Sequence, residues 1–358
     1  MSEKPENLSR RNALFNVARL SLASTLAASG AAAIAAPSAG SAGAAPLDEQ
    51  GAATAEKAID TLEGTFGKHK GMRRNHTKGI GALGTFVGNP AASAEYSRSL
   101  LFSGAPIAVV ARFSIAGGNP VVEDKEKSTR GLGLEFRLPD GSMHHITMLN
   151  TPMFFARMPK TFIDKFAAAK PDPATGKPVP AVVKAFNATH PDAAAQTMFL
   201  TDNNPPPSYA NSAFYGIHTF KFVNADNRVT LVRWRFVPHD GEKNLTDAEM
   251  ATAPNDFLYD ALTERLKKGP VRWDMLVSIG EPGDSETDPT ILWPANRKEI
   301  NVGTLTLTSA SPPETAASNR INFDPLVMAD GILPTEDPIL LFRSPSYAYS
   351  YARRQSEG

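Results

Sequence analysis

The 358-residue chain contains no cysteine. This absence excludes disulfide frameworks, iron–sulfur clusters, thiolate zinc sites and cysteine nucleophiles. Any redox chemistry must therefore come from a bound cofactor. The chain also has no excess of positive charge, because 37 Lys+Arg residues balance 37 Asp+Glu residues. Nucleic acid is not expected as a partner, since binding a polyanion requires a basic field.

Long apolar runs are absent beyond the N-terminal region, so we expect no stable membrane insertion. The chain is instead 42% apolar overall, with 19 Phe, seven Tyr and three Trp. This composition suits a large buried core and indicates a globular protein.

The first 45 residues differ in composition from the rest. Ser9-Arg10-Arg11 precedes a run rich in Ala, Ser and Leu at residues 13–36, and small residues continue to residue 45. This pattern is typical of a twin-arginine-type signal peptide with a small-residue spacer; a disordered Ala-rich tail is the alternative. Export predicts a periplasmic or secreted protein, cleaved between residues 33 and 46. Residues 46–358 would form one domain.

The pattern beyond the spacer predicts antiparallel hairpins mixed with helices, an α+β domain without internal repeats. Strands are expected at residues 106–114, 131–138, 214–223 and 228–237, with turns at 139–141 and 224–227. Helices are expected at residues 159–170, 180–187 and 255–268, and Pro-rich loops at 171–180, 204–207 and 333–345.

Several common site types are missing. None of the seven histidines has the i, i+4 spacing of a helical metal site, and adjacent His144 and His145 would face opposite sides of a strand. The Gly-x-Ser-x-Gly elbow and a glycine-rich phosphate loop are absent. Histidine-cage metalloenzymes, serine hydrolases and nucleotide-binding enzymes are therefore not favoured.

Six short motifs are more specific in combination than any is alone. They are Arg73-Arg74-Asn75-His76-Thr77-Lys78-Gly79, Val110-Ala111-Arg112-Phe113-Ser114, Arg130-Gly131, Asn150-Thr151-Pro152-Met153-Phe154-Phe155-Ala156-Arg157, Tyr215-Gly216-Ile217-His218-Thr219-Phe220-Lys221 and Arg343-Ser344-Pro345-Ser346-Tyr347. Together, in identity, order and rough spacing, they resemble the haem catalases from about Lys68 to Arg354. The short C-terminal region without a further extension, and the export signal, look like the small bacterial catalase-related peroxidases.

The resemblance implies a catalase-like antiparallel β-barrel of eight strands with surrounding helices, and haem b between barrel and helices. It also implies that Tyr347 is the ligand of the haem iron. A phenol must lose its proton to bind iron well, and Arg343, one helical turn earlier, supplies the positive charge that favours the phenolate.

The same resemblance makes His76 the distal histidine, which would take a proton from one peroxide oxygen and return it to the other. Ser114 would orient its ring. Arg73, Arg112 and Arg354 would bind the haem propionates, with Arg74 as the alternative to Arg73. Residues expected to line the haem and its channel are Phe154, Phe155 and Phe162. His218 is expected to be structural.

One position departs from the family pattern. Catalases have two asparagines before Thr-Pro-x-Phe-Phe, and the first points at the peroxide; here the pair is Leu149-Asn150. On a regular strand Leu149 would face the haem, whereas a β-bulge would bring Asn150 there as a catalytic residue. If Leu149 faces the iron, a polar group that positions a second peroxide is lost.

We therefore expect a haem peroxidase that reduces hydrogen peroxide or organic hydroperoxides, oxidises small organic donors and has weak catalase activity. A fatty-acid hydroperoxide isomerase or lyase on the same barrel, and a non-catalytic haem-binding protein, are the alternatives. The partners are a peroxide and a small reductant. Oligomerisation is compatible with the sequence, which does not define the number of subunits.

Overall fold

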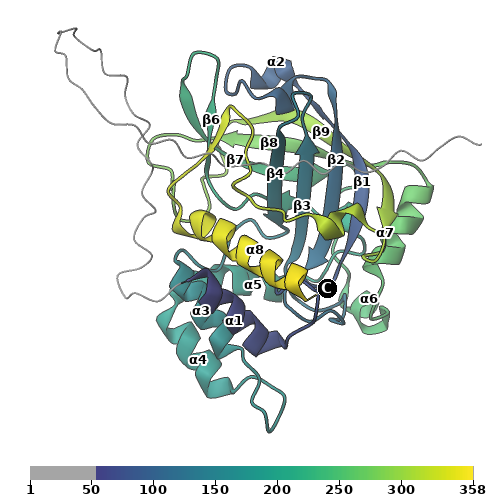
Figure 1. Cartoon of the computed structure of the whole chain (residues 1–358), viewed down its shortest axis with the longest axis vertical. Helices are drawn as coiled ribbons and strands as arrows, with labels where there is room; N and C mark the ends of the chain where they lie inside the picture. The colour runs from purple at the N-terminus through teal and green to yellow at the C-terminus, as the bar shows by residue number, and fades with distance from the viewer. Residues whose placement is uncertain (1–53, 358) are drawn as a thin grey trace, which may run out of the picture. The chain divides into compact units, whose positions relative to one another are not determined.

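The computed structural model describes residues 54–357, and strands pair around a closed antiparallel β-barrel (Figure 1). The strands follow the ring order β7-β5-β4-β3-β2-β1-β9-β8, and pairing of β7 with β8 closes it. The eight-strand prediction is therefore confirmed. The ring strands are β1 (Gly79–Gly88), β2 (Pro106–Ile115), β3 (Arg130–Arg137), β4 (Met143–Leu149), β5 (Phe214–Tyr215), β7 (Val229–Pro238), β8 (Val271–Ile279) and β9 (Glu299–Ser311).

Two further short strands, β6 (Phe220–Val223) and β10 (Ile332–Pro334), extend the sheet beyond β7. Alternation along β3 separates the two faces of the barrel wall: Leu132, Leu134 and Phe136 belong to the main core cluster, while the residues between them face outward. Gly131 and Gly133 alternate with these core residues on β3, so no side chain projects from the outer face of the barrel wall at these two positions.

The described residues contain eight α-helices. Helices α1, α3 and α8 pack against one another, and in Figure 1 α8 crosses the barrel near the ends of β3 and β4. The predicted helices at 159–170, 180–187 and 255–268 are confirmed as α3, α4 and α7. The bounds are α1 (Ala55–Phe66), α2 (Pro90–Ser93), α3 (Pro159–Ala168), α4 (Pro180–Thr189), α5 (Ala194–Asp202), α6 (Asp247–Thr252), α7 (Leu258–Lys267) and α8 (Pro338–Ser356).

Two predicted segments are wrong in extent. The strand at 214–223 is split, because the chain turns at Ile217 with a φ of 56° and His218 N–H bonds to Gly216 C=O. The loop at 333–345 is largely helix α8. Pro338 occupies the first turn, where its missing N–H costs nothing, and Asp337 caps the helix.

The described residues belong to one compact unit, Ala44–Gly358. The predicted signal peptide, spacer and cleavage site at residues 1–45, and the first residues of the predicted 46–358 domain, lie outside the described part of the chain. Within residues 54–357 no helix combines the length and apolar character needed to cross a bilayer.

Candidate functional site

A large cavity lies beside the barrel wall and is bordered by helices α1, α3, α5 and α8. The space within it amounts to about 1410 Å³, including the open solvent at its mouth. The structure brings most of the predicted site residues to this one cavity. Those that line it are Arg73, His76, Arg112, Ser114, Phe154, Phe155, Phe162, Arg343, Tyr347 and Arg354.

On the barrel side, the His76 imidazole is held in one orientation. Its Nδ1 lies 2.9 Å from Ser114 Oγ at the end of β2. Its backbone has a φ of 53°, a left-handed conformation that non-glycine residues seldom adopt, and the His76 N–H donates to Asn75 Oδ1 at 2.9 Å. A Cβ on Gly131 would lie 2.9 Å from the ring. With Nδ1 engaged, Nε2 is the nitrogen available to the cavity.

The electrostatic environment keeps this imidazole neutral. Burial, together with the positive charges of Arg112, Arg343 and Arg73, lowers the pKa of His76 to about 3. At neutral pH His76 is therefore a proton acceptor.

On the helix side, the Tyr347 hydroxyl is bound by Arg343 from the preceding turn of α8. Arg343 Nη2 donates to Tyr347 Oη at 2.9 Å and to Thr147 Oγ1 on β4 at 2.5 Å. The geometry places a guanidinium within hydrogen-bond distance of the phenol oxygen.

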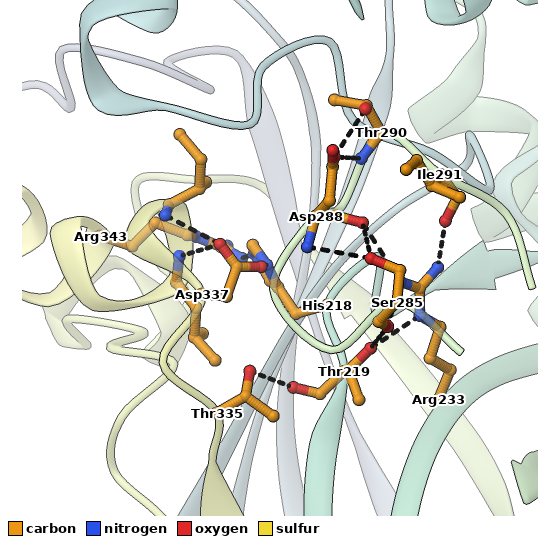
Figure 2. A network of polar contacts seen from close by, with 12 residues as sticks. His218, Thr219, Arg233, Ser285, Asp288, Thr290, Ile291, Thr335, Asp337 and Arg343 are labelled. Atoms are coloured by element: carbon orange, nitrogen blue, oxygen red, sulfur yellow. Dashed lines mark hydrogen bonds and ion pairs between the residues drawn. The ribbon is translucent and has the colours of Figure 1, made fainter. Parts of the chain in front are cut away.

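Arg343 is itself fixed by two fully buried residues, His218 and Asp337 (Figure 2). Its Nη1 lies 2.9 Å from His218 Nε2, and His218 Nδ1 lies 2.6 Å from Asp337 Oδ2. Since Arg343 can only donate, Nε2 accepts and Nδ1 carries the proton given to Asp337. Burial lowers the pKa of His218, which agrees with this neutral form. His218 is thus structural, as expected, and positions Arg343.

Three arginines form a cationic group at the cavity. Arg73 donates to the C=O groups of Ser318 and Ile321, Arg112 donates to Thr77 C=O, and buried Arg354 has Nε and Nη1 without a partner. Within residues 54–357 none of the three pairs with a carboxylate. Burial lowers the pKa of Arg73 and of Arg112, the latter to about 10, and each lies in the repulsive field of Arg354.

Three guanidinium groups that share one cavity and have no carboxylate partner indicate a ligand with more than one carboxylate. A haem, with two propionates and an iron that a phenolate can bind, fits this set of donors. Arg74 does not belong to the set, because its guanidinium bonds to Glu63 and Glu357 at 2.7 and 2.5 Å and does not line the cavity.

Asn150 requires a correction, because the structure does not bring it to the cavity. Its Oδ1 accepts from Arg130 N–H at 2.7 Å, and it lines a separate polar pocket. The register between β3 and β4 runs without a bulge from Gly131↔Leu149 to Arg137↔Met143. Regular alternation therefore turns Leu149 to the central cavity and Asn150 away from it.

Several residues that shape the site lie outside the sequence motifs. They are Thr147 and Gln196, which line the cavity, and Asp337, which does not. The Asp337-Pro338 pair was a detectable signal, because an aspartate followed by proline is typical of a helix start. Thr147 and Gln196 belong to no recognisable sequence motif, so only the structure identifies them.

Comparisons with known proteins agree with this geometry. The profile of the family described as Catalase matches residues 57–357. A catalase-related peroxidase of Synechococcus elongatus is 49% identical, covering 96% of this chain and 98% of that protein. A catalase-related peroxidase of Mycolicibacterium paratuberculosis is 33% identical, covering 85% and 96%. A solved bacterial catalase superposes with a TM-score of 0.72 at 26% identity, covering 80% of this chain and 58% of that one.

Proposed function

The chain belongs to the catalase family and is an oxidoreductase acting on peroxide, and from this premise we propose that it is a haem b peroxidase. It would reduce hydrogen peroxide or organic hydroperoxides and oxidise small organic donors, with weak catalase activity. One observation supports this proposal above all: His76, Tyr347 and three arginines that lack carboxylate partners line the same cavity.

Each residue has a defined task in this proposal. Tyr347 would bind the iron, and Arg73, Arg112 and Arg354 would bind the propionates. Haem would supply the metal that binds peroxide and takes up its oxidising equivalents. His76 Nε2 would accept the proton of one peroxide oxygen and give it to the other, so that water or an alcohol leaves. Ser114 would hold the ring in the orientation that this transfer requires.

Leu149 supports the preference for organic donors. Its side chain lines the cavity with no hydrogen-bonding group, whereas the Asn150 amide is bound to the Arg130 backbone. A second hydrogen peroxide would find no amide there to orient it, so its oxidation to oxygen would be slow. Ser9-Arg10-Arg11 and the Ala-rich run support an exported, periplasmic or secreted enzyme.

The test uses the haem-loaded protein with hydrogen peroxide, with and without an aromatic donor, and records oxygen release and donor oxidation together. Peroxide consumption that depends on the donor, with little oxygen, is expected. Rapid oxygen release without a donor would overturn the peroxidase assignment. A ketone, epoxide or aldehyde formed from a fatty-acid hydroperoxide without donor oxidation would instead indicate an isomerase or lyase.

Leu149→Asn is expected to raise oxygen release by about 3- to 10-fold, the rate equivalent of one added neutral hydrogen bond. The amide would face the cavity from the same backbone position and orient the second peroxide. The matched control is Leu149→Met, which keeps the volume but adds no amide. Equal oxygen release from both variants, measured with an oxygen electrode, would contradict the role of Leu149.

A further inference from the structure

Gln196 on α5 presents a polar group to the cavity from a buried position, with only 2% of its surface exposed. Its Nε2 donates to Thr151 Oγ1 at 3.0 Å and to Met153 C=O at 2.9 Å. Thr151 Oγ1 uses its own proton for Met153 C=O, at 3.0 Å. Since both partners can only accept from Gln196, the orientation of the amide is fixed.

The Gln196 Oε1 atom is left without a donor. No N–H or O–H group in the described part of the chain hydrogen-bonds to it, and the amide group turns it away from the Thr151–Met153 backbone. A carbonyl oxygen can only accept hydrogen bonds. Gln196 Oε1 is not one of the fully enclosed polar atoms, so it can be reached from the cavity that Gln196 lines. It can therefore accept a hydrogen bond from a ligand that carries an O–H or N–H group.

Aromatic side chains line the same cavity as this acceptor. Phe154 follows Met153 directly, and Phe154, Phe155 and Phe166 line the same cavity as Gln196. The Phe154 and Phe155 ring centroids lie 4.4 Å apart, and those of Phe155 and Phe166 lie 6.1 Å apart. A flat aromatic ligand can pack on such a wall in the edge or offset geometry that aromatic pairs prefer.

This wall comes from different elements than the cationic group. Arg73, Arg112 and Arg354 lie before β1, on β2 and on α8, whereas Gln196 lies on α5 and the phenylalanines on the segment from Phe154 through α3. Lys165 Nζ lies 3.7 Å from the Phe155 ring centroid, but Lys165 does not line the cavity. Toward the cavity the wall therefore offers the Gln196 acceptor, which suits a ligand with an O–H or N–H group better than a carboxylate.

We propose that Gln196, Phe154, Phe155 and Phe166 form a subsite for a neutral aromatic reductant with an O–H or N–H group, a phenol or an aromatic amine. The ring would pack on the phenylalanines while its O–H or N–H donates to Gln196 Oε1. The proposal rests on the proposed peroxidase function and names its donor. Two phenols would each lose one electron and one proton, reducing one hydroperoxide to an alcohol and water and leaving two phenoxyl radicals.

The test compares p-phenylenediamine with N,N,N′,N′-tetramethyl-p-phenylenediamine, which has the same ring but no N–H group. Gln196→Met removes the acceptor at nearly constant volume. In this variant of the haem-loaded protein we expect the KM for p-phenylenediamine, relative to that of the tetramethyl compound, to rise by about 3- to 10-fold, the equivalent of one neutral hydrogen bond.

Thr151→Val is the matched control, because it removes one anchor of the amide and keeps Oε1. It should preserve the ratio of the two KM values. If Gln196 served only to hold the Thr151–Met153 backbone, both variants would change the KM values of the two donors alike, and the subsite would be refuted.

A second readout separates this proposal from the proposed function. Calorimetric titration of the protein with phenol and with anisole, which lacks the O–H, should show tighter binding of phenol, and Gln196→Met should abolish the difference. Wild-type protein that oxidises neither diamine with peroxide, yet shows this discrimination, would refute the function alone. Oxidation of both diamines, with a KM ratio that Gln196→Met leaves unchanged, would refute the subsite alone.

Discussion

Replacing His76 with alanine is expected to slow the reaction of the haem-loaded protein with hydrogen peroxide by about 10²- to 10⁴-fold, the usual contribution of a positioned acid–base group. The imidazole is the proton acceptor at the cavity, with Nδ1 engaged by Ser114 and Nε2 available. Stopped-flow absorbance after mixing with peroxide measures the rate. Haem content, measured in parallel, should be preserved, because His76 is not the residue proposed to bind the iron.

The pH profile gives an independent check. Burial lowers the pKa of His76 to about 3, so the neutral, active form persists at all pH values well above 3. The wild-type rate should stay level from pH 8 to pH 5 and decline only as the pH approaches that pKa. Ser114→Ala keeps His76 but removes the hydroxyl that orients its ring. We expect this variant to react with peroxide about tenfold more slowly than wild type. A His76→Ala variant as fast as wild type would assign the proton transfer to another group.

Asp337→Ala should lower the free energy of unfolding by about 1.5 to 5 kcal/mol. The change leaves the buried Nδ1–H of His218 without its acceptor, which costs roughly 1–3 kcal/mol. It also removes the cap of α8, where Oδ1 accepts from Ile339 and Leu340 N–H, for roughly 0.5–2 kcal/mol. Urea unfolding followed by circular dichroism measures the loss.

Asp337→Asn is the control that separates the two contributions. The Asn amide oxygen can still cap α8. Its NH₂ group, however, faces the Nδ1–H of His218, and because both groups are donors that hydrogen bond is lost. We expect this variant to recover the capping part of the stability. It should still change the visible absorbance of the haem-loaded protein, because His218 then holds Arg343 differently at Tyr347. Unchanged absorbance in both variants would show that the Asp337–His218 pair does not position Arg343.

Local patterns were sufficient for much of the fold. Alternating apolar residues with a Pro-Asp-Gly turn predicted the β3–β4 hairpin, and helical periodicity predicted α7. Barrel closure was not visible in these patterns, because β1 pairs with β9 and β7 with β8 across long sequence separations. The prolines of α8 suggested a loop, since composition alone does not distinguish a proline in the first turn from one in a loop.

The site divides in the same way. The sequence motifs identified His76, Tyr347 and three arginines, Arg73, Arg112 and Arg354. The structure brings these residues to one cavity. The choice between Leu149 and Asn150 depended on strand register, which a single sequence leaves open. Gln196 acquires its significance only from the two acceptors that orient its amide, 45 and 43 residues away in the chain.

The position of α8 in the chain has a consequence for biosynthesis. This helix carries Arg343, Tyr347 and Arg354, and it follows every barrel strand. The bond from Arg343 to His218 spans 125 residues and the bond from Arg343 to Thr147 spans 196, and contacts of such sequence separation form slowly. During synthesis His76 is therefore made well before Tyr347. The complete site forms only when α8, the last helix, packs against the barrel.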